Sequence, residues 1–85
     1  MQVQILPKAA KDLKGLSPPD RGRVIQKIQQ YAAEPESQAN NTKHLQGSDL
    51  LRLRVGDYRV LFTVQNGVVT VMLVHRVRHR SEAYD

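Results

Sequence analysis

The chain has 85 residues, of which 40% are hydrophobic and 25% charged, and its 13 Lys and Arg against 8 Asp and Glu give a net charge of +5. A chain of this length forms one domain with one small core, the absence of cysteine excludes disulfides and thiolate metal sites, and no apolar run approaches the ~20 residues of a membrane span. Because the start, MQVQILPK, also lacks the order of a signal peptide, we expect a single domain over residues 1–85 in the reducing cytoplasm, with no membrane segment and no metal.

The positive charges are divided unevenly along the chain. All five lysines lie before Leu51, whereas six arginines and no lysine follow it, opposed only by Asp57, Glu82 and Asp85. Arginine presents a planar fork of donors that matches phosphate, while lysine is a hydrated point charge. The second half therefore favours an anionic partner, with nucleic acid first, although a soluble surface that is merely basic would have the same composition.

The N-terminal part of the chain predicts a strand and two helices. Alternation in QVQIL, residues 2–6, indicates a short strand, and Pro7 suits the first turn of a helix that Gly15 ends. Ser17 can cap a second helix. In that second helix, apolar residues recur at helical spacing: Val24, Ile25, Ile28, Tyr31 and Ala32. We expect a helical hairpin with one apolar side.

The remaining chain predicts a loop and three strands. The segment Glu34–Thr42 is polar and has no periodicity, which is typical of a loop. Gly56-Asp57 and Asn66-Gly67 both fit two-residue hairpin turns. They separate three predicted strands: Leu50–Val55, Tyr58–Gln65 and Val68–His75. We therefore expect an α+β fold in the order β-α-α-β-β-β, a small, mainly antiparallel four-stranded sheet with the helical hairpin on one face and its second hairpin strand at the centre.

The Gly56-Asp57 turn fixes the register of its two strands. Val55 then pairs with Tyr58, and Arg54 pairs with Arg59. The face that carries Val55 is apolar and can bury the helices, whereas the opposite face carries the three hairpin arginines, Arg52, Arg54 and Arg59. Like charges directly opposite each other destabilise a sheet by about 0.2–1 kcal/mol. Such a cost favours an anion-binding site, and a solvated face with splayed side chains stays the alternative.

A tight turn at Asn66-Gly67 would extend this register to the third strand. Met72 and Val74 then lie on the arginine face, where apolar residues beside arginines suit a ligand with phosphates and flat bases. His75 falls on the core side and is expected to be structural. The predicted core consists of Leu13, Leu16, Val24, Ile28, Tyr31, Leu53, Val60, Phe62 and Leu73.

Two stretches of the chain, LRLRVGDYRVLFTV and GVVTVMLVHRVRHRSEAY, resemble toxins of the RelE/ParE superfamily of toxin–antitoxin systems. The basic-x-basic pair before a turn, the YR that opens the next strand and the RxRSExY tail carry the resemblance, which covers nearly the whole chain and is strongest to the RelE branch. It implies a small antiparallel sheet with two helices on one side. It also implies an endoribonuclease that cuts messenger RNA on the ribosome and that a cognate antitoxin neutralises.

Residue by residue, the resemblance implies a catalytic set of Arg52, Arg54, Arg59, Arg78 and Tyr84. Arg54 and Arg59 would clamp the phosphoryl oxygens and Arg78 would neutralise the leaving oxygen, while Tyr84 would stack on a base or orient the nucleophile. Arg76 and Arg80 are expected to contact the substrate. The reaction needs no metal and no cofactor.

The general base is open, because arginine is a poor proton acceptor and Arg52 and Arg54 stand where the best-known members have lysines. His79 and His44 are the candidates, because a neutral imidazole can accept a proton. His79 lies between two arginines and near Tyr84, and His44 lies in a segment that supplies a carboxylate base in some relatives.

The expected partners are a cognate antitoxin protein, the ribosome and mRNA, with no small-molecule cofactor. Two other functions are compatible with the pattern. A ParE-like toxin of the same fold would inhibit DNA gyrase without nuclease activity, and an inactive RNA-binding module would bind without cutting.

Overall fold

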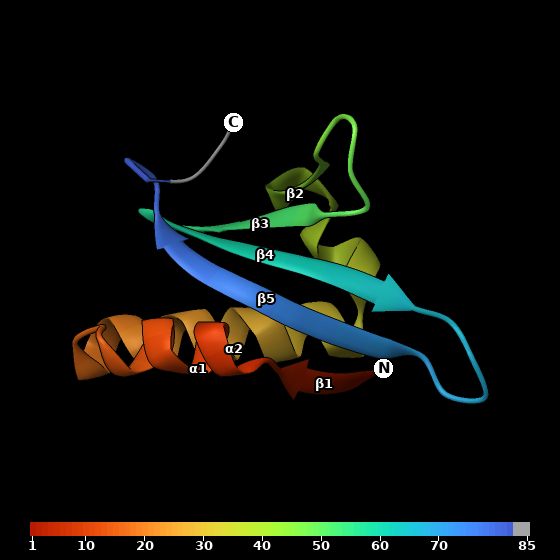
Figure 1. Ribbon diagram of the computed structural model, residues 1–85, viewed down its shortest axis with the longest axis horizontal. Helices are drawn as coiled ribbons and strands as arrows, with labels where there is room; N and C mark the ends of the chain where they lie inside the picture. Colours follow the sequence, from red (N-terminus) through yellow and green to blue (C-terminus); the bar gives the residue numbers. More distant parts are fainter. Residues whose placement is uncertain (83–85) are drawn as a thin grey trace.

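A computed structural model describes residues 1–82 (Figure 1). The helices are α1 (Pro7–Lys14) and α2 (Pro18–Ala33), followed by the 3₁₀ helix η1 (Pro35–Asn41). The strands are β1 (Gln2–Ile5), β2 (Thr42–His44), β3 (Leu51–Val55), β4 (Tyr58–Gln65) and β5 (Val71–His79). Within the described residues, no helix is both long and apolar enough to cross a membrane.

The strands form one sheet in the order β1-β5-β4-β3-β2, in which only the β1–β5 pair is parallel. The predicted α+β class, the helical hairpin and the central place of β4 are confirmed. The expected number of strands was wrong, because the sheet has five strands rather than four. The additional strand, β2, comes from the border of the segment predicted as a loop. Three residues are too few to show a period of two.

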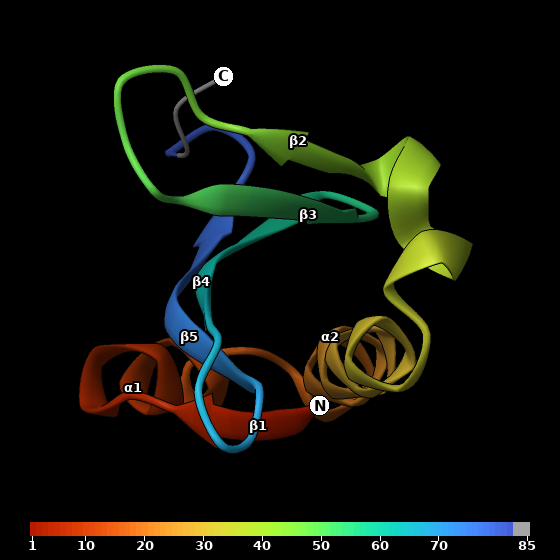
Figure 2. The same cartoon turned by 90° about the vertical axis from the view of Figure 1, so that its right-hand side faces the viewer.

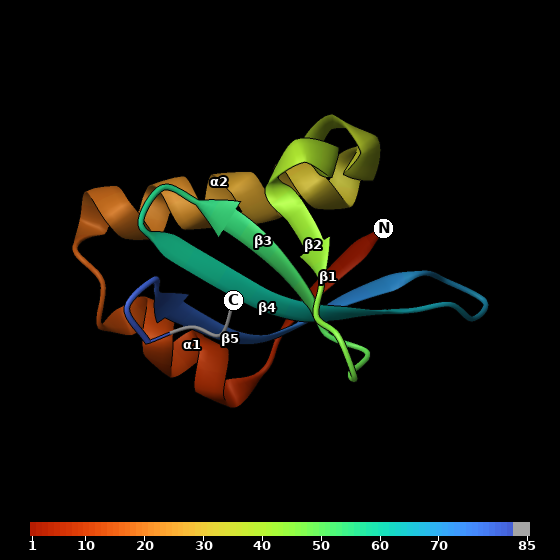
Figure 3. The same cartoon turned by 90° about the horizontal axis from the view of Figure 1, so that it is seen from above.

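The helices begin where the sequence predicts. Pro7 opens α1, and the Ser17 side chain accepts a hydrogen bond from the Asp20 backbone N–H at 3.4 Å, which caps α2. The twisted sheet curves around α2, and α1 lies beside β5 (Figures 2 and 3). Both helices supply residues to one core cluster with β3, β4 and β5.

Most of the predicted core is buried. Its centre is Phe62, which is fully buried and meets Tyr31 edge-on with ring centroids 4.7 Å apart. The other predicted residues that are buried are Leu13, Val24, Ile28, Leu53 and Val60. Leu16 is only partly buried against this cluster, and Leu73 lies outside it.

The two predicted turns differ in outcome. The Gly56-Asp57 turn is confirmed, with Gly56 at a φ of 56° and the predicted pairs Val55–Tyr58 and Arg54–Arg59. Asn66-Gly67 is not a two-residue turn, because Gln65 pairs with Val71 across a longer loop. The tight turn needs a positive φ at Gly67, and only Gly47 and Gly56 have one in the described chain.

The longer loop changes which face of the sheet each side chain in the first half of β5 occupies. It shifts the register by three residues, an odd number, so that every side chain changes face. Met72 and Val74 therefore lie fully buried in the core rather than on the arginine face, and Leu73 pairs with Thr63 on the opposite side.

A β-bulge then changes the alternation again. Leu61 pairs with Arg76 whereas Phe62 pairs with Val74, which leaves His75 as the extra residue. The His75 Nε2 lies 2.9 Å from the Thr63 hydroxyl. The prediction of His75 on the core side was therefore wrong. Beyond the bulge Val77 returns to the core, and Arg76 and Arg78 lie on the face opposite to it.

Asp12 attaches α1 to β5. Its carboxylate accepts hydrogen bonds from Arg76 Nε at 2.8 Å and Nη2 at 3.1 Å, and from the Val77 backbone N–H at 2.9 Å. Beside it, the Leu6 N–H donates to the Val74 carbonyl at 3.0 Å. Burial alone would raise the pKa of Asp12, but the bonds from Arg76 and Val77 outweigh it and hold this pKa below its usual value.

We expect Asp12→Ala to lower the free energy of unfolding by about 1–3 kcal/mol, because it leaves the Val77 N–H and the Arg76 guanidinium without their acceptor. Denaturant unfolding at neutral pH measures this loss. Asp49→Ala, which removes an exposed carboxylate from the β2–β3 loop, is the matched control and should change little.

The Asp12 contribution should also depend on pH. A carboxylate whose pKa is lower in the folded state stabilises the fold above its unfolded pKa of about 3.9, and this stability is lost as pH falls through the folded value. The difference between parent and Asp12→Ala should therefore shrink below about pH 4. A difference that stays constant down to acid unfolding would contradict the charged role of Asp12.

Candidate nucleic-acid interface

Three arginines form a row across three neighbouring strands. Arg54 of β3 pairs with Arg59 of β4, and Arg59 pairs with Arg78 of β5. Because adjacent strands lie about 4.8 Å apart, the row spans about 10 Å of the sheet. We call these three residues the arginine row. The sequence predicted the first pair, and the bulge at His75 adds Arg78 to it.

A second row lies next to the first. Lys43 pairs with Arg52, Arg52 with Leu61, and Leu61 with Arg76, so that four strands contribute. Leu61 is only 8% exposed although it lies outside the main core cluster. The aliphatic stems of the flanking arginines can cover it. The two rows together form a basic face on the side of the sheet opposite to α2, with Leu61 beneath its centre. At β5 this face is bordered by α1, where Asp12 binds Arg76.

The members of the arginine row are held to different degrees. The Arg59 Nη1 donates to the carbonyls of Gly56 at 2.9 Å and Tyr58 at 3.0 Å, so the β3–β4 turn orients this guanidinium. Arg78 forms an ion pair with Glu82 at 3.1 Å. Arg54 is exposed and makes no ion pair with any residue in the range 1–82. The row thus combines one oriented guanidinium with two that face solvent at least in part.

Neither candidate base shares this basic face. His79 pairs with Tyr58 on the helix side of the sheet, where the two rings meet edge-on at 5.6 Å, and its Nδ1 accepts from the Ser81 N–H at 3.2 Å. His44 is exposed on β2 opposite Leu51, a residue that packs against the core. The histidine that does lie on the basic face is His75.

The remaining predicted residues lie towards the tail. Arg76 is tied to Asp12 by the bidentate pair described above. Arg80 is exposed, with its backbone N–H bonded to the Asp57 carbonyl at 2.7 Å and its Nε 3.7 Å from the Asp57 carboxylate. Tyr84 lies outside the described residues. Its predicted role therefore stays a prediction.

Sequence reasoning missed four contributors to this region. Asp12 resembles any charged residue on a helix surface, and its acceptor role depends on a strand more than sixty residues away. His75 is brought to the basic face by a bulge. Lys8 and Lys11 of α1 border a hollow beside Arg78, and their spacing of three residues, which places them on one helix face, was the available signal.

Comparison with known proteins gives one family and several structures. The family model described as the ParE toxin of the type II toxin–antitoxin system parDE matches residues 3–84. Among curated protein sequences, none matches the chain significantly.

Several solved structures share the fold. A chain of the RelBE2 toxin–antitoxin complex from Mycobacterium tuberculosis has a TM-score of 0.78 at 26% identity, covering 93% of this chain and 96% of that chain. A chain of the RelE–RelB complex from Pyrococcus horikoshii has a TM-score of 0.73 at 27% identity, covering 96% and 97%. The YoeB/ParE toxin from Agrobacterium tumefaciens has a TM-score of 0.76 at 14% identity, covering 93% and 98%, which supports the fold alone.

Arg54→Gln should leave the protein as stable as the parent or more stable by up to about 1 kcal/mol, because it relieves the like-charge pair with Arg59. Added salt should narrow the difference by screening the repulsion. Denaturant unfolding at low and high ionic strength measures both effects. Arg23→Gln, which removes an arginine paired with Asp20 on α2, is the control and should bring no gain. A clear loss of stability in Arg54→Gln would show that Arg54 supports the fold.

Proposed function

Since the chain belongs to the ParE toxin family of type II toxin–antitoxin systems, within the RelE/ParE superfamily, we propose that it is a ribosome-dependent endoribonuclease that cleaves mRNA. The observation that carries the proposal is the arginine row, in which three neighbouring strands place paired arginines on one strip of the sheet. Neighbouring cations of this kind suit a transition state that gathers charge on phosphoryl oxygens.

The proposed reaction is attack of an RNA 2′-hydroxyl on the adjacent phosphorus. The bond from the 2′-oxygen to phosphorus forms, the bond to the 5′-oxygen breaks, a base takes the 2′ proton, and the leaving 5′-oxygen gains one. Arg54 and Arg59 bind the non-bridging oxygens, and Arg78 neutralises the leaving oxygen. The turn carbonyls that hold Arg59 support this role, because an oriented donor needs little reorganisation during the reaction.

The base is assigned to a group other than an arginine. His75 shares the basic face, but its partner Thr63 is four residues from Arg59 along β4, a distance of about 13 Å at the usual rise per residue. That separation is too long for a group acting on the phosphate at the arginine row. His79 and His44, which lie off the basic face, stay the proposed candidates for the base, and Tyr84 stays the proposed residue that stacks on a base or orients the nucleophile.

The second candidate function is gyrase inhibition without nuclease activity. It is favoured by the family match, whose description is that of a ParE toxin. Cleavage of message on purified ribosomes tests the first function, and supercoiling by purified gyrase in the presence of the protein tests the second.

We also propose a cognate antitoxin as the partner. The structures from Mycobacterium tuberculosis and Pyrococcus horikoshii are toxin–antitoxin complexes by their descriptions, which supports this proposal. The basic face fits a partner segment that is acidic and partly apolar, with carboxylates opposite the arginines.

Arg59→Ala should cut message about 10²–10³-fold more slowly than the parent, which is the usual effect of losing one fixed donor to a transition-state oxyanion. Arg59→Lys should restore only part of the rate, because it keeps the charge and loses the fork. Single-turnover cleavage on programmed ribosomes measures the rates, and thermal melts of the same preparations report folding. Arg23→Ala, on α2, is the control with the same loss of charge.

Two results would contradict this proposal. One is cleavage by Arg59→Ala at the parent rate, and the other is loss of activity in step with loss of stability. A parent protein that cuts no message and blocks gyrase would favour the second function.

Antitoxin association should slow markedly between low and moderate salt, because electrostatic steering is screened over about 10 Å at 0.1 M. Stopped-flow association rates at several salt concentrations measure this. Arg54→Gln should weaken the salt dependence, whereas Arg23→Gln, on α2, should leave it unchanged. Association rates that do not change with salt concentration would contradict electrostatic steering of the antitoxin.

A further inference from the structure

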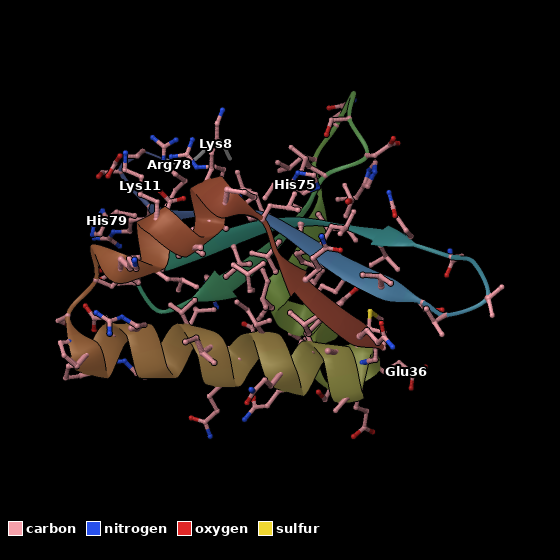
Figure 4. The ribbon with its side chains drawn as sticks, turned by 60° about the horizontal axis from the view of Figure 1, so that its bottom comes forward. Lys8, Lys11, Glu36, His75, Arg78 and His79 are labelled. Carbon is pink, nitrogen blue, oxygen red and sulfur yellow. The ribbon has the colours of Figure 1, made fainter. Side chains whose placement is uncertain are left out.

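A groove runs between α1 and the second half of β5. Its first part is a hollow of about 760 Å³ whose lining includes Lys8 and Lys11 from α1 and Arg76 and Arg78 from β5. Figure 4 shows the two lysines projecting from α1 on the side where Arg78 lies. Because Arg78 also belongs to the arginine row, this hollow continues the basic face past the edge of β5.

A second hollow of about 510 Å³ adjoins the first. It is lined by Leu6, Pro7, Lys8, His75 and Arg76, so it shares Lys8 and Arg76 with its neighbour. A histidine ring beside a proline and a leucine offers a flat and largely apolar surface. We call the two hollows together the α1–β5 groove.

The charges of this groove are balanced only in part. The Asp12 carboxylate is occupied by Arg76 and the Val77 N–H, and the Glu82 carboxylate by Arg78. Lys8 and Lys11 are exposed and form no ion pair with any residue of the described chain. Their ammonium groups are therefore the cations of the groove that are available to an anion from outside.

We propose that the α1–β5 groove binds the RNA chain next to the scissile phosphate, with Lys8 and Lys11 on backbone phosphates and one base in the hollow beside His75. Residues three apart on a helix have Cβ atoms about 5–6 Å apart, so both ammonium groups can reach the same stretch of backbone. Unpaired bases are commonly held by stacking on aromatic rings, which the His75 hollow permits. The inference rests on the proposed function for its choice of RNA.

The test is binding of a short single-stranded RNA whose 2′-hydroxyls are methylated, so that it cannot be cleaved, followed by fluorescence anisotropy at several salt concentrations. The variant Lys8→Gln with Lys11→Gln should bind more weakly, and its slope of log affinity against log salt should fall by about 1.4, at about 0.7 for each lost phosphate contact on a single strand. Lys14→Gln with Lys27→Gln removes the same charge outside the groove and should keep the parent slope.

His75→Ala should weaken binding about 5- to 150-fold, the range for loss of one stacked base, without changing the salt slope. Thermal melts confirm that each variant is folded. The same variants, tested for association with ribosomes that carry no message, separate ribosomal RNA from message as the source of the bound backbone. Weaker binding to the single-stranded RNA supports the proposal, whereas a loss confined to message-free ribosomes would make ribosomal RNA the ligand and overturn it.

The inference is overturned if both lysine pairs behave alike, or if the groove variants lose affinity for the antitoxin and not for RNA, which would make it a site for an acidic protein. Because the RNA is not cut in this assay, the result does not depend on nuclease activity. A parent that binds RNA through Lys8 and Lys11 but cleaves no message would reject the proposed function and keep the groove.

Discussion

The β-bulge at His75 allows β5 to supply apolar side chains to the core and arginines to the opposite face of the sheet. Without an extra residue, a strand that buries Met72 and Val74 would also bury position 76 and expose Val77. With it, Val74 and Val77 both reach the core while Arg76 and Arg78 both reach the opposite face. The third member of the arginine row, the hydrogen bonds that Arg76 donates to Asp12 and the groove beside α1 all depend on this one irregularity.

The basic face gathers like charges that a fold would otherwise keep apart. Two carboxylates reduce the repulsion at the β5 side, since Asp12 pairs with Arg76 and Glu82 pairs with Arg78. The turn carbonyls accept hydrogen bonds from the Arg59 guanidinium. Arg54, at the β3 end of the row, has no such counterpart among the described residues. A phosphate placed between Arg54 and Arg59 would supply the missing negative charge, which is the physical reason to regard the row as a binding surface.

Local signals in the sequence predicted the parts of the structure that local geometry decides. Pro7, Ser17 and the Gly56-Asp57 turn determine their surroundings within a few residues, and each gave the correct element or register. Asn66-Gly67 predicted a tight turn that does not form. The dipeptide permits such a turn but does not require it, and the longer loop buries Met72 and Val74. Three features arise from contacts with distant strands: the bulge, the three-residue β2 and the acceptor role of Asp12. The residues next to them in the sequence therefore carry no signal that predicts them. The arginine pair could be predicted, and the addition of Arg78 to it could not.

The parallel pairing of β1 with β5 joins the first strand of the fold to the last one. Gln2 meets Val71, and α1 docks on β5 through Asp12, so β1 has no strand partner and α1 no anchor on the sheet until β5 has been made. During synthesis on the ribosome, β1 and α1 can contact α2 but can join the sheet only after β5 emerges, and contacts of such long range form late and slowly. The arginine row is completed by the same strand. A nascent chain thus lacks both its closed core and its full set of arginines until synthesis of the fold is nearly finished.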